Sequence, residues 1–115
     1  MTASCIFCRI IAGEHPGKIV FSDESVIVIE DIAPQAPFHY LIIPRRHIPT
    51  VIDLAEEDTS LVGHVTLVAG RLAREQGFAE RGFRLVVNCN HDGGQTVWHL
   101  HYHLLAGRHF RWPPG

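Results

Sequence analysis

The sequence predicts one α+β domain, spanning residues 1–115, built on an antiparallel sheet of roughly five strands with one long and one short helix. The chain has 115 residues, which is the size of a single domain. The predicted helices are separated by runs of strands and do not alternate with single strands, an order typical of α+β proteins. Apolar residues make up 46% and charged residues 19% of the chain, which argues against a disordered protein.

The first part of the chain is predicted to form a short helix and three strands. Cys5–Ala12 places apolar side chains at helical spacing, and Gly13 ends this helix. A polar turn joins the first two strands, and a segment with two prolines, expected to be irregular, precedes the third. These strands span residues 18–21, 26–30 and 38–44, with the turn at 22–25 and the irregular segment at 31–37.

The second part is predicted to hold the long helix and two more strands. The acidic segment 55–59 begins a helix that ends near Gly77. Its apolar stripe consists of Leu61, Val62, Val65, Val68, Ala69 and Leu72. A strand at 84–88 and a polar loop at 90–94 precede a long alternating strand at 96–105.

Charge and cysteine content narrow the classes of function. The net charge is −2 and no basic run stands out, so we expect no nucleic-acid partner. No apolar stretch approaches the roughly 20 residues that span a bilayer, so we expect no membrane partner. The N-terminal residues lack the features of a secretory signal. Three cysteines, an odd number, favour a reducing compartment, and we expect a cytoplasmic protein.

Nine histidines are unusual for a chain of this size, and three of them alternate along the last predicted strand. His99, His101 and His103 would share one face of that strand, because successive strand side chains point to opposite faces. A row of histidines beside an apolar face indicates chemistry more than a solvated surface. Either two imidazoles converge on a metal, or one imidazole is a nucleophile that its neighbours orient.

The loop before this strand favours phosphate chemistry over metal hydrolysis. Gly93 and Gly94 allow backbone N–H groups to approach an anion closely. Neutral donors on Asn88, Gln95 and Thr96 suit a phosphate better than a metal site that holds only water. The residues alone leave the metal-hydrolase interpretation open.

The segment 99–105, His-Leu-His-Tyr-His-Leu-Leu, resembles the signature of the histidine triad (HIT) family. Segments that resemble the Hint branch of that family cover nearly the whole chain; they are residues 31–39, 42–48, 93–98, 106–108 and 112–115. The resemblance implies the HIT-like fold. It also implies a homodimer in which the long helix and the strand 84–88 pair across a two-fold axis and continue the sheet.

The resemblance further implies a hydrolase that acts at the α-phosphate of purine nucleoside 5′-phosphoramidates and also binds the AMP-like monophosphate. His101 would attack phosphorus and form a covalent nucleotidyl-histidine, while the carbonyl of His99 holds its other nitrogen. His103 would bind a phosphate oxygen and assist the leaving group, and His39 would approach the nucleophile. No redox cofactor is expected. The alternative is a nucleotide-binding zinc scaffold in which turnover is incidental.

The same resemblance assigns residues to the substrate. Asp31 would accept hydrogen bonds from the ribose; the alternative is a turn residue. Trp112 in the C-terminal tail would face the leaving group beside the partner's site. The nucleoside slot would be Ile6, Phe7, Ile10, Ile29 and Ile32, which could otherwise be plain core. Asn88, Gly94, Gln95 and Thr96 would cradle the phosphate, with Val97 also against the substrate.

The pair Cys5 and Cys8 has several interpretations from its spacing. A thioredoxin-like redox pair lacks the βαβ context it needs, and a disulfide is disfavoured in a reducing compartment. Two incidental thiols or half of a zinc site remain. The resemblance implies that His47 and His99 complete a zinc site. Such a Cys₂His₂ set is closed, so the zinc would be structural. We assign no role to Cys89.

Overall fold

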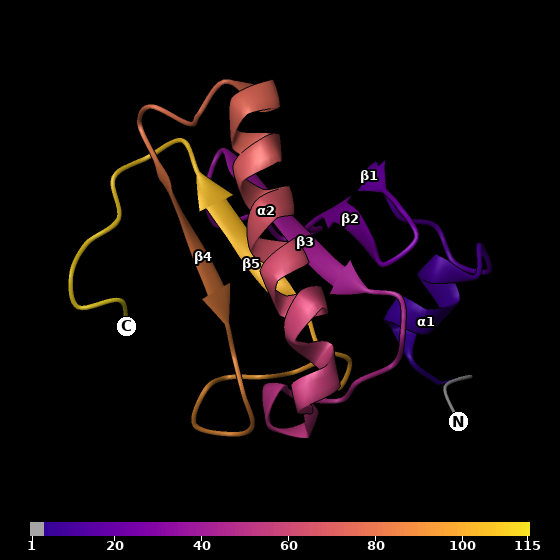
Figure 1. Cartoon of the computed structure of the whole chain (residues 1–115). Coiled ribbons are helices and arrows are strands. Elements are labelled where there is room, and N and C mark those ends of the chain that lie inside the picture. The colour runs from indigo at the N-terminus through magenta and orange to yellow at the C-terminus, as the bar shows by residue number, and fades with distance from the viewer. Residues whose placement is uncertain (1–3) are drawn as a thin grey trace.

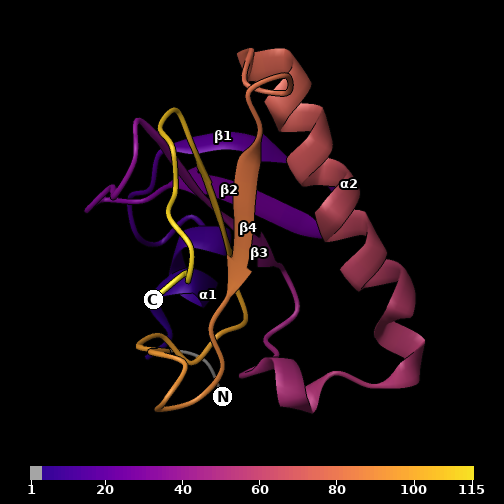
Figure 2. The same ribbon diagram turned by 90° about the vertical axis from the view of Figure 1, so that its left-hand side faces the viewer.

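The computed structural model describes residues 4–115, and it contains a five-stranded antiparallel sheet with a helix on each face (Figures 1 and 2). The strand order is β1-β2-β3-β5-β4. The predicted α+β class and the five strands are therefore confirmed. The strands are β1 (Ile19–Ser22), β2 (Val26–Glu30), β3 (Phe38–Pro44), β4 (Phe83–Val87) and β5 (Tyr102–Ala106), and the helices are α1 (Ile6–Ile11) and α2 (Thr59–Gln76).

Helix α2 covers one face of the sheet and forms the larger core (Figure 2). Short 3-10 turns at Val51–Asp53 and Glu56–Asp58 precede it, so the α-helix begins at Thr59, at the end of the predicted opening segment. Gly77 ends it in the left-handed conformation, with φ of +86°, as a C-terminal glycine commonly does. Of the predicted stripe, Val65, Val68, Ala69 and Leu72 are buried, whereas Leu61 and Val62 are only partly buried.

Helix α1 lies on the opposite face over a smaller core. Its Phe7 and Ile10 are buried against side chains of β2 and β3, namely Ile27, Ile29, Leu41 and Ile43. The helix has only six residues, and an isolated helix of that length is not stable in water. Contacts with the rest of the molecule must therefore hold it in place. None of the helices within residues 4–115 is long and apolar enough to cross a membrane.

The predicted strand 96–105 is wrong in its first half, because β5 begins only at Tyr102. The β3–β5 register pairs Tyr102 with Ile42, and two residues earlier Leu100 would face Pro44, which has no N–H to offer the ladder. The N–H of Leu100 instead donates to the carbonyl of Ile48 at 2.6 Å. His99, in a bend, and His101 thus lie in the lead-in to the strand, and only His103 lies within it.

Candidate functional site

A pocket of about 790 Å³ opens on the face of the sheet that carries α1. This volume lies within the range of sites that bind small molecules. His101 and His103 line it together with α1, the end of β2 and the loop before the triad. The structure brings together there most residues expected to bind the substrate: Ile6, Phe7, Ile10, Ile29, Asp31, Ile32, Asn88, Gly94, Thr96 and Val97. Ile32 is fully exposed and lies at the rim.

His101 has a defined tautomer because its ring is tied to the backbone. Its Nδ1 lies 2.8 Å from the carbonyl oxygen of His99. A carbonyl can only accept, so Nδ1 carries the proton and Nε2 carries the lone pair. Burial lowers the pKa of His101, and the ring of Phe7 packs edge-on against it at 5.0 Å between centroids. The imidazole is therefore held neutral, with Nε2 as its basic nitrogen.

His103 has the opposite tautomer, which a chain of hydrogen bonds sets from the backbone. The N–H of Gln35 donates to His39 Nδ1 at 3.0 Å, so the proton of His39 is on Nε2. His39 Nε2 lies 2.9 Å from His103 Nδ1 and donates to it. His103 therefore carries its own proton on Nε2. Asp31 Oδ2 is the second acceptor near His39 Nε2, at 3.4 Å.

These histidines are neutral at neutral pH because burial disfavours the charged imidazole. Burial, together with smaller contributions from positive charge on His101 and His39, lowers the pKa of His103 to about 4. Burial also lowers the pKa of His39, although the carboxylate of Asp31 opposes this shift. The pocket thus presents one imidazole as a base and one as a neutral hydrogen-bond donor.

A second cluster joins Cys5, Cys8, His47 and His99 at the edge of α1, with one ligand atom from each within 4.8 Å of the others. Zinc–sulfur bonds of about 2.3 Å and zinc–nitrogen bonds of about 2.0–2.1 Å place tetrahedral ligand atoms about 3.3–3.8 Å apart. Three sulfur–nitrogen distances here are 3.3 to 3.5 Å, and the two Nδ1 atoms, at 3.1 Å, are slightly closer than this range. The geometry of this set fits a tetrahedral zinc ion.

The protonation of His99 also fits a metal ligand. Its Nε2 donates to the carbonyl of Pro44 at 2.7 Å, so Nδ1 carries the lone pair and is the atom near both cysteine sulfurs. Burial lowers the pKa of His99 and keeps the ring neutral, as binding requires. Because His99 and His101 direct their nitrogens to different partners, the three triad histidines do not converge on one metal. The geometry does not favour a metal hydrolase that uses all three triad histidines.

Comparison with known proteins identifies the family. A family model described as "Scavenger mRNA decapping enzyme C-term binding" matches residues 4–110. A HIT family hydrolase from Legionella pneumophila superimposes with a TM-score of 0.94 and 48% identity, over 96% of this chain and 99% of that one. The chain belongs to the HIT family. A histidine triad protein from Clostridium difficile gives a TM-score of 0.92 at 42% identity, over 95% of each chain.

Curated relatives of this HIT protein match most or all of its length. The purine nucleoside phosphoramidase of Escherichia coli is 47% identical over 108 residues, which cover 94% of this chain and 91% of that protein. An uncharacterized HIT-like protein of Synechococcus elongatus is 44% identical over 115 residues and covers both chains fully. The resemblance of the triad and its flanking segments to the HIT family is thus confirmed.

The structure does not bring Gln95 to the pocket of this HIT protein. Its Oε1 accepts from the N–H of Asn90 at 2.9 Å, and its Nε2 donates to the carbonyls of Pro49 and Val97 at 2.8 and 3.0 Å. The backbone N–H of Gln95 donates to the carbonyl of Asn90. The side chain is buried, and its hydrogen bonds hold the loop that was expected to cradle the phosphate.

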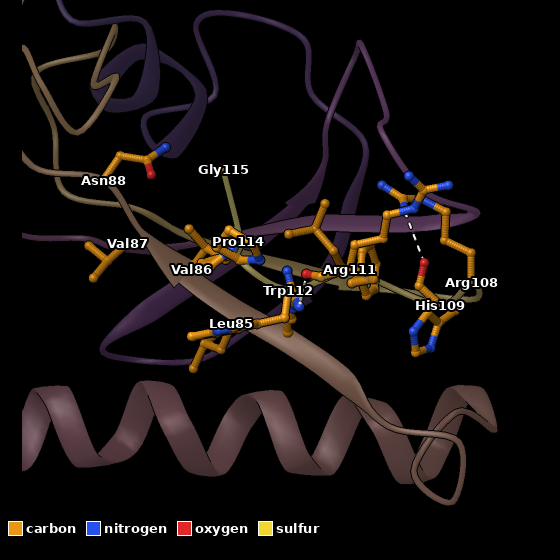
Figure 3. Close-up of a pocket in the computed structure, with 14 residues that line it drawn as sticks. Leu85, Val86, Val87, Asn88, Arg108, His109, Arg111, Trp112, Pro114 and Gly115 are labelled. Atoms are coloured by element: carbon orange, nitrogen blue, oxygen red, sulfur yellow. Dashed lines mark hydrogen bonds between the residues drawn. The ribbon is translucent and has the colours of Figure 1, made fainter.

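Trp112 also lies away from the nucleoside pocket. It is 82% exposed and lines a separate cavity of about 940 Å³ between the C-terminal tail and β4. Figure 3 shows the side chains of the tail and of β4 that line this cavity. Arg84 donates to the carbonyl of Arg111 and fixes the tail to β4. Asn88, which follows β4, lines both cavities.

Sequence reasoning missed several features that build the site. Leu41 lines the pocket two residues after His39 on β3, and the period of two along a strand was the signal for it. The N–H of Gln35 and the carbonyl of Pro44 set histidine tautomers, but they are backbone groups that no residue type reveals. Further lining residues are His15, Pro16, Gly17, Lys18, Glu30 and Pro34.

Proposed function

We propose that this HIT protein hydrolyses purine nucleoside 5′-phosphoramidates by cleaving the P–N bond at the α-phosphate. The observation that carries the proposal is the pair of opposite tautomers in one pocket. His101 offers a lone pair on its Nε2, and His103 offers an N–H group on its own Nε2. A nucleophile beside a neutral donor is what displacement at phosphorus needs. The name of the Escherichia coli relative, purine nucleoside phosphoramidase, supports this substrate class.

The reaction has two displacements. His101 Nε2 attacks the α-phosphorus, the P–N bond breaks, and the amine leaves with the bonding pair and takes a proton from water. Water then attacks the nucleotidyl-histidine, releases the nucleoside monophosphate and gives up a proton, and His101 recovers its lone pair. Because the pKa of His103 is about 4, its Nε2–H acts as a neutral donor to a phosphoryl oxygen.

The pocket walls hold the nucleotide. The apolar side chains of α1 and β2 enclose the purine, and Asp31 accepts hydrogen bonds from the ribose. Asp31 is positioned for this, because its Oδ1 already accepts from the N–H of Ala33 at 2.8 Å and fixes the carboxylate. The phosphate lies against Asn88, Gly94 and Thr96, near both histidines.

Steady-state hydrolysis of a fluorogenic adenosine phosphoramidate tests this proposal. We expect release of the amine together with AMP, and the guanosine analogue run in parallel reports the base preference. Absence of hydrolysis by protein that binds AMP would favour the alternative of a nucleotide-binding scaffold.

We also propose that Cys5, Cys8, His47 and His99 hold a structural zinc ion. When bound, zinc would tie α1 to the end of β3 and to the lead-in of β5, and it would contribute to folding stability. Elemental analysis of protein purified without chelator should find one zinc per chain, and finding none would count against the site. Chelation should lower the melting temperature more than it lowers kcat.

We further propose a homodimer in the cytoplasm. β4 lies at one edge of the sheet, where its backbone groups are open to pairing with a second copy. Phe83 and Val87 on β4 and Leu67 on α2 are exposed apolar residues that a partner would cover. Light scattering should find twice the chain mass at micromolar concentration, and a monomer there would refute the dimer.

A further inference from the structure

Helix α1 takes part in two sites at once. Ile6, Phe7 and Ile10 line the nucleotide pocket, while Cys5, its N-cap residue, and Cys8, in its first turn, belong to the metal set. The two cysteines are three residues apart, which places them on the same side of a helical turn. One short element thus forms a pocket wall with some side chains and a metal half-site with others.

The cysteines tie this wall to the rest of the protein. Cys5 Sγ lies 3.4 Å from His99 Nδ1, and Cys8 Sγ lies 3.3 Å from His47 Nδ1. Cys5 Sγ also accepts from the N–H of Cys8 at 3.4 Å and so caps the helix. Because six residues cannot hold a helix by themselves, the order of α1 depends on these ties and on its apolar contacts.

A second connection runs between the metal ligand and the proposed nucleophile. His99 and His101 are two residues apart, and the carbonyl of His99 accepts the Nδ1 proton of His101. The ring of Phe7 packs edge-on against both, with centroids 5.9 Å from His99 and 5.0 Å from His101. The placement of α1, the metal set and the reacting imidazole therefore depend on one another.

We propose that the metal ion and the nucleotide bind this protein with positive coupling through α1. Each ligand needs α1 in the same place, the metal for Cys5 and Cys8 and the nucleotide for Ile6, Phe7 and Ile10. The first ligand to bind orders this helix, and the second no longer has to. By linkage, each must raise the affinity of the other by the same factor. This inference rests on the proposed function and on the proposed zinc site.

Two titrations on the full chain test the coupling. We expect calorimetry to give an AMP affinity about tenfold higher in zinc-loaded than in metal-depleted protein. Zinc affinity, measured against a competing chelator, should rise by the same factor when AMP saturates the protein. Circular dichroism establishes that the depleted protein is folded. Cys8→Ala should reproduce the loss of AMP affinity, and Cys89→Ala, which alters a cysteine outside the set, should not.

If the depleted protein unfolds, cobalt-loaded protein provides the measurement instead. AMP should change the visible absorption of the bound cobalt with a midpoint at the Kd for AMP, and Phe7→Leu should weaken this response. Equal AMP affinities in loaded and depleted folded protein, or a cobalt spectrum that AMP leaves unchanged, would overturn the coupling. Failure to bind zinc would remove the proposed metal site, and failure to bind AMP would remove the proposed nucleotide site. Each failure also overturns the coupling, and the separate titrations tell them apart.

Discussion

The two faces of the sheet are built for different purposes. Under α2 lies a core of fifteen buried hydrophobic side chains, which include Tyr40 and Tyr102. Under α1 lie six buried apolar side chains, and on the same side of the molecule are the pocket and the metal set. The same strands supply both faces, because Tyr40 and Ile42 of β3 point to one and Leu41 to the other. Alternation along a strand thus directs some side chains to the α2 core and others to the face that carries the pocket.

The largest effect should come from His101→Ala, on the face with the pocket. Loss of the proposed nucleophile should lower kcat by several orders of magnitude. AMP affinity should stay within a few-fold, because the apolar walls and the loop donors remain. Stopped assays of the phosphoramidate and calorimetry with AMP measure the two quantities.

His64→Gln on α2 is the matched control, since this histidine pairs with Asp23, away from the pocket. Its kcat should equal that of the wild type. Undiminished turnover in His101→Ala would refute the assignment of His101 as the nucleophile.

Leu72→Ala, on the α2 face, should lower stability and leave turnover unchanged. Leu72 is 1% exposed, and truncation of a buried leucine lowers the free energy of unfolding by about 2–5 kcal/mol. At low temperature, where the variant stays folded, kcat/KM should be unchanged. Urea denaturation and the hydrolysis assay check both. A large loss of kcat in folded Leu72→Ala would show that the two faces are not independent.

Much of this division could be predicted from the sequence. A period of 3.6 identifies α2, runs of apolar residues identify β2 and β3, and the triad with its flanking segments implies the pocket residues of α1 and β2. The start of β5 could not be predicted, because it depends on the β3–β5 register. That register places Leu100 opposite Pro44, which is distant in the sequence. The structural role of the Gln95 side chain depends in part on its hydrogen bond to the carbonyl of Pro49, 46 residues away. Hydrogen bonds to backbone groups leave no pattern in residue types.

A smaller effect should appear in the pH dependence of stability. The pKa of His103 is about 4 in the folded protein against 6.5 as its ordinary value. Between these values the unfolded chain binds more protons, so the free energy of unfolding rises with pH across this window and levels off above it. His103→Gln should make the free energy of unfolding rise less steeply with pH, because the contribution of one titrating group is lost. Identical slopes from urea denaturation between pH 4 and 7 would contradict the shift.

The smallest effect on stability should follow deletion of residues 112–115. Trp112 is 82% exposed and lies outside both cores, so the melting temperature should change little. The cavity that the tail forms with β4 shares Asn88 with the pocket, so the preference among leaving amines should change more. Rates for a series of phosphoramidates with different amines measure this preference. Unaltered relative rates would show that the tail does not contribute to recognition of the leaving amine.

The most direct test of the proposed chemistry is to trap the covalent intermediate. In His103→Ala the donor that assists turnover is lost while Nε2 of His101 keeps its lone pair. Protein quenched during reaction with an adenosine phosphoramidate, then digested and examined by mass spectrometry, should carry an adenylyl group on His101. Continued hydrolysis without any adenylylated peptide, or an adenylyl group on another residue, would contradict the account.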